Sequence, residues 1–354
     1  MGDEPAQPTP RPAVVRMAPY SPPSSGRAGK LRLDFNENTV GASPRVIEAL
    51  RRYLDAGALT VYPEYEEIKP ALARFFGVAP EEFILTNGTD EAIQVLVNTY
   101  VDDGDDVIVL HPSYAMYRFY SEVAGAAIRE LSYREPDLAF PLEELEAAIH
   151  TKTRAVLISN PNNPTGTGIG LEAVERILRA APHAAVLIDE AYFEFSGVTA
   201  LGLIARYPNL FVSRTFSKVY GMAAMRVGCL FSQAANVAYL HKAQSPYSVN
   251  MLAAVAARAA AEDADYVRGY VAEALAAREA IYAGLDGLGI RHYRSQANFV
   301  LFHVGPRSIE IRDKLRGRGV LVRDRSYEIA GCVRVTCGTR EQAARFLGEL
   351  EAIL

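Results

Sequence analysis

Lys218 lies in a short turn between two apolar segments, Asn209–Val212 and Val227–Phe231, which predict buried strands. Gly221 favours the bend between them, and Arg226 follows the lysine by eight residues. Only the neutral lysine amine attacks a carbonyl, and partial burial between strands favours that form. These residue types therefore indicate a lysine that can form a Schiff base, with an anion held nearby by Arg226. A solvated surface lysine is the alternative that this segment alone leaves open.

Asp189 is the second residue whose position indicates chemistry, because it ends the apolar segment Ala184–Ile188. A carboxylate that emerges from a buried strand must be paired or hydrogen-bonded, since leaving it desolvated alone is costly. Its partner could be a structural arginine or a cationic ring nitrogen.

Two further apolar segments are followed by residues that can contact a ligand. Gly88, Thr89 and Asp90 open a predicted helix, and the backbone N–H groups of a helix start form a pocket for an anion. Tyr114 follows the next segment, where its ring could lie against a planar ligand. An ordinary capped helix and a core tyrosine remain the alternatives at these two places.

The loop NPNNPTG follows the apolar segment Ala155–Ser159. Two Asn-Pro steps and a glycine restrict the backbone of this loop, and they present the amides of Asn160, Asn162 and Asn163 at the strand end. Turn chemistry accounts for the prolines but not for so many amides beside them.

Strand-length and helix-length segments alternate over much of the chain. The predicted strands are Phe83–Leu85, Val107–Leu110, Ala155–Ser159, Ala184–Ile188 and Asn209–Val212, and helices between them include Glu91–Tyr100, Leu142–Ile149 and Leu171–Ala180. This order predicts an α/β fold, with a mostly parallel sheet covered by helices on both faces. Ligands of such sheets gather beyond the carboxyl ends of the strands, so we expect the residues above to meet there.

The pattern changes after about residue 245. A long Ala-rich helix, Met251–Leu288, precedes strands and helices that predict a smaller α+β unit. We therefore expect three parts: an N-terminal arm (1–38), a large domain (39–245) and a small domain (246–354). The arm is crowded with Pro and Ser near its start, and we expect it to pack on the small domain or on a partner subunit.

Composition argues for a cytoplasmic protein of ordinary globular type. The chain has 354 residues, 49% of them hydrophobic, and a net charge of -5, which gives no general attraction for nucleic acid or anionic membranes. No apolar run approaches the roughly 20 residues that cross a bilayer, and the N-terminus lacks the apolar centre of a secretory signal. The three cysteines form no CxxC pair, which favours buried free thiols over a metal site.

One ligand uses an anion pocket, an aromatic face, an amide, an acid, a lysine and an arginine together: pyridoxal 5'-phosphate. The chain resembles the fold type I pyridoxal-phosphate aminotransferases, and within them the histidinol-phosphate aminotransferase branch. The resemblance covers nearly the whole chain, through LDFNEN, YPEY, NGTDEAI, HPSYAMY, NPNNPTG, LIDEAY, RTFSKVYGMAAMRVG and CVRVTCGT in this order. Each motif alone is weak, whereas their ordered conjunction is specific.

The resemblance implies a seven-stranded sheet and a role for each matching residue. Lys218 would form the Schiff base, Asp189 would keep the pyridine nitrogen protonated, and Tyr114 would stack on the ring. Asn163 and Tyr192 would hydrogen-bond the ring oxygen. The phosphate would be bound by the following residues: Gly88, Thr89, Asp90, Thr215, Ser217 and Arg226.

The resemblance also implies partners and substrates. Tyr62 would reach the phosphate of the neighbouring subunit's cofactor, so a homodimer with shared active sites is expected. Arg334 would bind the anionic group of the substrate, and Arg323 is a second candidate for it, although a surface arginine is the alternative there. Tyr20 and Asn38 are further candidates for contact with the substrate.

The implied reaction moves an amino group from a small-molecule amino donor to a 2-oxo acid such as 2-oxoglutarate, by a ping-pong mechanism. The donor remains open among histidinol phosphate, an aromatic amino acid and a specialised amino acid. Thr39, where this branch usually has proline, and Ala224, where glycine is common, are departures that bear on the substrate rather than on the cofactor. A decarboxylase or lyase of the same fold, or a non-catalytic effector-binding domain, are the alternative functions.

Overall fold

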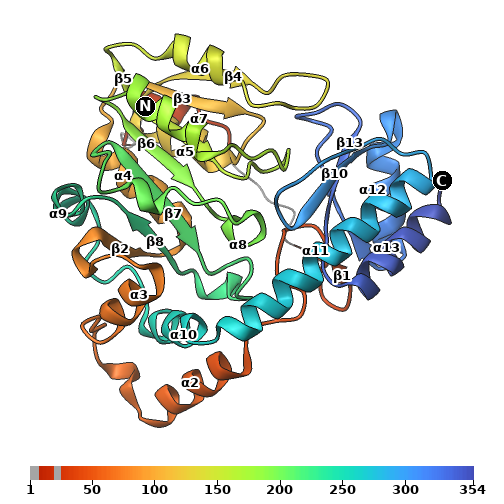
Figure 1. Ribbon diagram of the computed structural model, residues 1–354, viewed down its shortest axis with the longest axis horizontal. Coiled ribbons are helices and arrows are strands. Elements are labelled where there is room, and N and C mark those ends of the chain that lie inside the picture. The colour runs from red at the N-terminus through yellow and green to blue at the C-terminus, as the bar shows by residue number, and fades with distance from the viewer. Residues whose placement is uncertain (1–7, 20–24) are drawn as a thin grey trace, which may run out of the picture.

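The computed structural model describes residues 8–19 and 25–354, which form two units that each contain a β-sheet (Figure 1). The larger sheet has seven strands in the order β2-β8-β7-β6-β5-β3-β4. These strands are β2 (Phe83–Thr86), β3 (Asp106–His111), β4 (Ala127–Ser132), β5 (Thr153–Ser159), β6 (Ala185–Asp189), β7 (Leu210–Thr215) and β8 (Gly228–Phe231). Only β8 runs antiparallel to its neighbours, so the predicted mostly parallel, seven-stranded sheet is confirmed.

Side chains of the central strands alternate between two hydrophobic cores, one on each face of the sheet. In β3, Val107 and Val109 belong to one core, whereas Ile108 and Leu110 belong to the other. Because successive side chains of a strand point to opposite faces, a strand that is apolar throughout must be covered on both sides. The continuous apolar runs that predicted these strands therefore also dictate helices on both faces.

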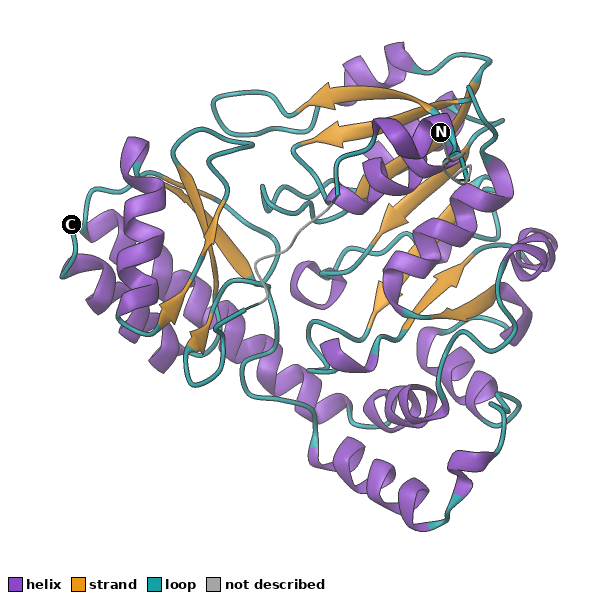
Figure 2. Cartoon of the chain, turned by 180° about the vertical axis from the view of Figure 1, so that it is seen from behind, coloured by secondary structure: helices purple, strands orange, loops and turns teal. Residues whose placement is uncertain are grey.

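Figure 2 shows these helices from behind, packed around the sheet. One core joins the sheet to α4 (Gly88–Tyr100), α5 (Ala115–Ala124) and α9 (Ala234–Ala243). The other joins it to α3 (Ile68–Phe76), α6 (Leu142–Ala148), α7 (Leu171–Ala180) and α10 (Met251–Ala261). Helix α2 (Pro44–Asp55) packs against α10, and the short α8 (Phe193–Ser196) follows β6. Single 3₁₀ turns lie at Ala58–Thr60, Pro80–Glu82, Leu201–Leu203, Ala223–Met225 and Gly305–Arg307.

The smaller unit is an antiparallel four-stranded sheet with helices and a core of its own. Its strands, in spatial order, are β12 (Arg323–Asp324), β13 (Cys332–Thr336), β10 (Phe299–His303) and β9 (His292–Tyr293). Its core includes residues of α11 (Ala264–Gly287), α12 (Ser308–Gly317) and α13 (Arg340–Glu351). Two short parallel strands, β1 (Leu31–Arg32) and β11 (Val320–Leu321), attach the N-terminal part of the chain to this unit.

Two features differ from the expectation. The predicted single helix Met251–Leu288 is wrong, because the chain leaves helical geometry at Asp263 (φ −118°, ψ 59°) and continues as α11 in a new direction (Figure 1). Strand β4 was not predicted, because it pairs on one side only and its side chains are mostly exposed, so it lacks an apolar run.

Near the N-terminal end of the chain, α1 (Pro12–Arg16) packs on α5.

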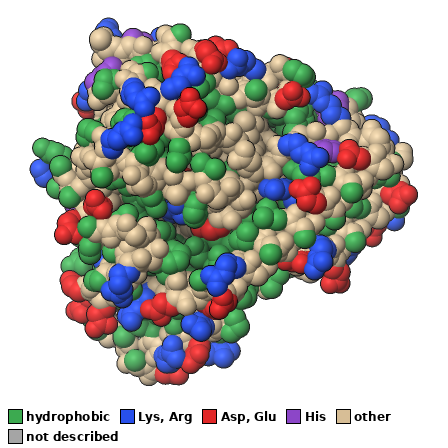
Figure 3. Space-filling view, in the orientation of Figure 1, with side chains coloured by type: hydrophobic (Ala, Val, Ile, Leu, Met, Phe, Trp, Pro, Cys, Tyr) green, Lys and Arg blue, Asp and Glu red, His purple; other side chains and the backbone are tan. Residues whose placement is uncertain are grey.

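Charged side chains of both signs are scattered over the face seen in Figure 3 and do not gather into a patch of one sign. Within residues 8–19 and 25–354, no helix is both long enough and apolar enough to cross a membrane.

Candidate active site

A cavity of about 580 Å³ lies beyond the carboxyl ends of the parallel strands, between the two units. This volume is typical of small-molecule sites. It brings together twelve of the residues named from the sequence, namely Thr89, Asp90, Tyr114, Asn163, Asp189, Tyr192, Thr215, Ser217, Lys218, Arg226, Arg323 and Arg334. We call the part formed by Thr89, Asp189, Ser217, Lys218 and Arg226 the sheet end, and the part formed by Arg323, Arg325 and Arg334 the arginine end.

Lys218 occupies the turn between β7 and β8, as its sequence predicts. Gly221 closes this turn at φ +69°, and a Cβ there would lie 2.4 Å from the carbonyl oxygen of Gly41, so only glycine fits. Asn38 also fixes the turn, because its Nδ2 donates to the carbonyl of Val219 at 2.8 Å. The Lys218 amine is thereby held inside the cavity, where Nζ donates to the carbonyl of Phe35 at 3.1 Å.

Asp189 ends β6 with its carboxylate buried in the cavity wall. Its Oδ2 accepts a hydrogen bond from the Tyr117 hydroxyl at 2.7 Å, whereas its Oδ1 is buried without a partner among the described residues. Burial raises the pKa of this carboxyl, and the Tyr117 hydrogen bond opposes the rise. A buried acceptor without a donor is costly, so a cationic N–H group placed here would be bound strongly.

The start of α4 and Arg226 form a second polar part of the sheet end. Gly88 begins α4 at φ +74°, and a Cβ on it would lie 2.5 Å from Nη2 of Arg226, so the glycine allows the guanidinium to approach the helix start. Arg226 pairs with Asp90 at 3.1 Å and donates to the Ser217 hydroxyl at 3.3 Å. The backbone N–H groups of Thr89 and its neighbours, together with this guanidinium, can bind a phosphate.

Aromatic and amide side chains line the cavity between its two ends. The Tyr114 hydroxyl donates to Asp90 at 2.6 Å. The Tyr192 hydroxyl accepts a hydrogen bond from Nδ2 of Asn36 at 2.9 Å, and Arg334 donates to the side-chain oxygen of Asn163. The side-chain amide of Asn163, which the sequence predicts at this site, therefore connects the loop after β5 with the smaller unit.

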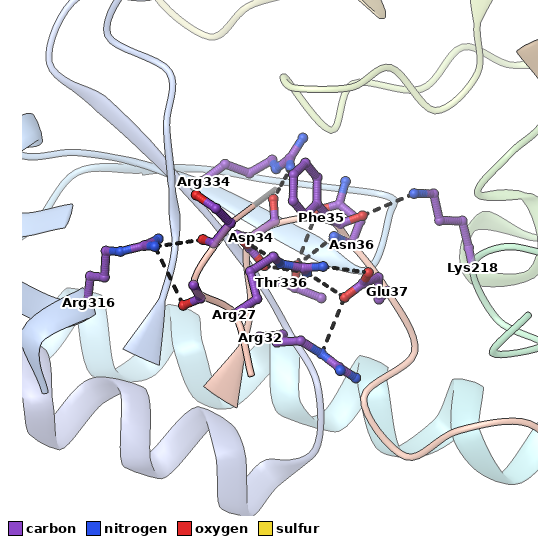
Figure 4. A network of polar contacts seen from close by, with 12 residues as sticks. Arg27, Arg32, Asp34, Phe35, Asn36, Glu37, Lys218, Arg316, Arg334 and Thr336 are labelled. Atoms are coloured by element: carbon purple, nitrogen blue, oxygen red, sulfur yellow. Dashed lines mark hydrogen bonds and ion pairs between the residues drawn. The ribbon is translucent and has the colours of Figure 1, made fainter. Parts of the chain in front are cut away.

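The segment 34–37 bridges the two ends of the cavity. Figure 4 shows Lys218 and Arg334 reaching this segment from opposite sides, Lys218 at the carbonyl of Phe35 and Arg334 at the carbonyl of Asp34. Asn36, in the left-handed region at φ +56°, is fixed by hydrogen bonds with the Thr336 hydroxyl. This segment therefore contacts both the lysine and the smaller unit.

The arginine end contains buried positive charge. Burial first, and then the neighbouring Arg325 and Arg323, together lower the pKa of Arg334 to about 10, because an apolar surrounding and nearby cations both disfavour its charged form. Cross-strand pairing of β12 with β13 places Arg323 directly opposite Arg334. This region is therefore suited to an anionic ligand.

A buried ion pair supports the β6 and β7 strand ends from below. Nε of Arg214 lies 2.7 Å from Glu190, and both side chains are almost fully buried. Next to it, the Tyr220 hydroxyl donates to Glu194 at 3.2 Å. Because Tyr220 lies two residues after Lys218, and Glu194 lies two residues after Tyr192, this contact ties the lysine turn to the loop after β6.

Some predicted residues lie elsewhere. Tyr62 is strongly exposed and contacts Tyr247 near a second hollow, away from this cavity. Asn38 does not line the cavity, because its amide is occupied by Val219 and by the backbone of Val40 and Gly41. Tyr20 lies outside the described residues.

The polar residues at the site that sequence reasoning missed include Arg325, Glu328, Asn36 and Tyr117. Arg325 was detectable, because it follows Arg323 by two residues in the segment VRDRS, and residues two apart share one face of an extended chain. Tyr117 was detectable as well, because it follows Tyr114 by three residues at a helix start. Asn36 and Glu328 meet the cavity only through loops, which leave no periodic signal.

Comparisons with known proteins identify the family of this chain. The chain matches the family described as aminotransferase class I and II over residues 28–350. It is 36% identical to a histidinol-phosphate aminotransferase of Symbiobacterium thermophilum, over 97% of this chain and 98% of that protein. It is 33% identical to histidinol-phosphate aminotransferase 1 of Carboxydothermus hydrogenoformans, over 97% of both chains.

A solved structure shares the fold. The histidinol-phosphate aminotransferase of Sinorhizobium meliloti, in complex with pyridoxal-5'-phosphate, superposes with a TM-score of 0.89 and 24% identity, over 99% of both chains. The predicted resemblance to aminotransferases, and the predicted cofactor, are thus confirmed. The chain belongs to the class I and II aminotransferases, which depend on pyridoxal phosphate.

Proposed function

We propose that the cavity is the active site, with pyridoxal phosphate at its sheet end. The observation that carries this proposal is the buried Oδ1 of Asp189, which lacks a donor in the part of the chain that the structure describes and lines the same cavity as Lys218. A pyridinium N–H supplies the missing donor, and the lysine amine supplies the anchor for an aldehyde. Asp189 therefore holds the ring nitrogen in its protonated form.

The remaining residues of the sheet end fit the other parts of the cofactor. The helix start at Gly88, Thr89 and Asp90, with Ser217 and Arg226, binds the phosphate, and Thr215 supports this loop because its Oγ1 accepts from the Ser217 N–H at 3.0 Å. Asn163 and Tyr192, which line the same cavity, would hydrogen-bond the ring oxygen, and Tyr114 would cover the ring.

Each residue then contributes a separate physical effect to transamination. When bound, pyridoxal phosphate supplies a carbonyl for the substrate amine and an electron sink for the substrate's Cα. The Lys218 amine accepts the proton from that Cα as general base, and its turn keeps Nζ within reach. Asp189 would stabilise positive charge on the ring nitrogen from its buried position. Arg334 orients the substrate by its anionic group.

We propose a phosphate-bearing amino compound, such as histidinol phosphate, as the amino donor, and a 2-oxo acid such as 2-oxoglutarate as the acceptor. Relatives that are 33% and 36% identical are named for histidinol phosphate. In this chain, Arg323 and Arg334 pair with no carboxylate among the described residues, so together they can balance one dianion.

We also propose a cytoplasmic homodimer with shared active sites. Leu54, Leu59, Val61 and Tyr62 are exposed apolar side chains on one region around α2 and the turn that follows it. Such a group of exposed apolar residues is typical of a protein interface. Tyr62 would contact the partner's cofactor phosphate across it. The division of the chain into an arm and two domains at residues 38 and 245 remains a prediction.

A half-reaction screen tests the proposed function. The holoenzyme is mixed with single amino donors, and absorbance reports conversion of bound pyridoxal phosphate to pyridoxamine phosphate. We expect fast conversion with histidinol phosphate and with glutamate, and full recovery when 2-oxoglutarate is added. Release of carbon dioxide, or loss of a substituent without a need for a 2-oxo acid, would instead assign a decarboxylase or lyase.

A further inference from the structure

A third arginine, Arg325, lines the arginine end of the cavity beside Arg323 and Arg334. Arg323 and Arg334 are already direct cross-strand neighbours. Like charges opposite each other destabilise a sheet, and a third guanidinium increases the repulsion. Local conflicts of this kind are typical of functional sites, and here a bound anion would relieve the conflict.

Each of the three arginines keeps a buried N–H group without an acceptor in the described part of the chain. The atoms are Nη1 of Arg323, Nε of Arg325 and Nε of Arg334. Buried polar groups in native proteins nearly always have a partner. Three unpaired donors on residues that line one cavity leave unsatisfied positive charge at this end, which an anion with several acceptor oxygens would offset.

Arg325 differs from the other two in its resting partner. Its Nη2 lies 2.5 Å from Oε2 of Glu328, and the side chains are only 9% and 13% exposed. Its Nη1 donates to the Tyr327 hydroxyl at 2.9 Å. Glu328 also lines the cavity, so a ligand in the cavity can compete with this carboxylate for Arg325.

We propose that Arg325 is a specificity-determining residue, which binds a phosphate group of the substrate in competition with Glu328. A carboxylate has two oxygens, which Arg323 and Arg334 can satisfy. A phosphate monoester has three terminal oxygens and a larger negative charge, so it can draw a third guanidinium away from its carboxylate. Carboxylate substrates leave the Arg325–Glu328 pair intact. This inference rests on the proposed anion-binding role of Arg323 and Arg334.

Equilibrium binding of inorganic phosphate and of acetate to the holoenzyme tests this inference by calorimetry. The holoenzyme is used because the bound cofactor already fills the phosphate site at the sheet end. Arg325→Met keeps the side-chain volume and should weaken phosphate binding about tenfold or more, while acetate binding changes less than about twofold. Glu328→Gln removes the competitor and should tighten phosphate binding about threefold.

Arg312→Met is the matched control. Arg312 lies nearby on α12, pairs with Asp313 and does not line the cavity, so its loss removes one positive charge without removing a ligand. We expect this control to leave both affinities unchanged.

Equal losses for phosphate and acetate in Arg325→Met would overturn the inference, because they would indicate only a general positive field. Unchanged phosphate binding would also overturn it. If Arg325→Met does not fold, phosphate binding to Glu328→Gln becomes the test. Unchanged phosphate binding in that variant overturns the inference. These affinities do not depend on the identity of the amino donor, so a failure of histidinol phosphate in the half-reaction screen would reject the proposed substrate and leave this result intact.

Discussion

At the sheet end of the cavity, Asp189 and Arg226 are held by partners that fix their positions. At the arginine end, Arg325 and Arg334 also have partners, but each of the three guanidinium groups keeps one buried N–H donor without an acceptor among the described residues. Asp189 has one oxygen fixed by Tyr117 and only Oδ1 unpaired. Arg323, Arg325 and Arg334 each keep an unpaired nitrogen among the described residues. We therefore expect the cofactor to stay bound at the sheet end and substrates to exchange at the arginine end.

The two ends also differ in the structures that carry them. The sheet end is formed by strand ends and turns of one seven-stranded sheet, so its residues share a rigid frame. The arginine end is carried by β12 and β13 of the smaller unit, and the segment 34–37 connects the two (Figure 4). Substitutions at the sheet end should therefore affect turnover, and substitutions at the arginine end should affect which substrates bind.

The largest effect is expected for Lys218→Ala. This variant should lose the visible absorbance of the covalently bound cofactor and lower kcat by about 10³-fold or more, because both the anchor and the general base are removed. Absorbance spectra and steady-state kinetics measure this. Lys242→Ala, which changes a lysine of α9 outside the cavity, is the control and should behave as wild type. Retention of colour and turnover in Lys218→Ala would mean that another amine is the anchor.

Asp189→Asn should lower kcat by about 10²-fold to 10³-fold with little change in KM for the amino donor, because the neutral amide no longer stabilises a protonated ring nitrogen. Tyr117→Phe is the companion variant. It keeps the carboxylate and removes only the hydrogen bond to Oδ2, so its effect should be about tenfold. If the two variants lost equal activity, Asp189 would be acting through the Tyr117 contact rather than through its charge.

The predictability of the site follows the same division between the two ends. The sheet end was predictable, because each residue there follows an apolar run and parallel strands bring their carboxyl ends to one edge. Asp189 and Lys218, far apart in the chain from Thr89, were placed together by that argument alone. The arginine end depends on how a second unit packs against the first, and no periodic pattern encodes that packing.

Errors in the fold have equally local causes. Strand β4 lies at the edge of the sheet, where it pairs only with β3 and most of its side chains are exposed. It therefore needs no apolar run. The break between α10 and α11 falls within an Ala-rich stretch whose composition favours helix on both sides of Asp263. Helix α10 packs against α2 and α3, and sequence periodicity does not report contacts of this kind.

Arg334→Ala should weaken the binding of anionic substrates by about 1.5 to 3 kcal/mol, the usual value for hydrogen bonds to a charged group. The loss should appear in KM and kcat/KM for glutamate, with a smaller change in kcat. Arg294→Ala, which removes a strongly exposed arginine of the same unit, is the control. If the constants for acidic substrates stay within about twofold of wild type, the anion-binding role of Arg334 is wrong.

The smallest effect concerns the support of the lysine turn and its dependence on pH. Burial raises the pKa of Glu194 from 4.5 to about 7, against the attraction of Arg214 and the Tyr220 hydrogen bond, while Glu190 adds to the rise. The folded chain then keeps a proton that the unfolded chain has released, so the free energy of unfolding should fall as pH rises from about 4.5 to 7.

Glu194→Gln should remove this contribution. Relative to wild type, the variant should gain about 1 to 3 kcal/mol of stability between pH 4.5 and pH 8, while its hydrogen bond with Tyr220 is kept. Thermal unfolding of both proteins over this pH range measures the difference, and Glu172→Gln, at the start of α7, is the control for an ordinary carboxylate. A stability difference that does not change with pH would mean that Glu194 stays ionised over this whole range, stabilised by the charge of Arg214. The lysine turn would then not depend on a protonated Glu194.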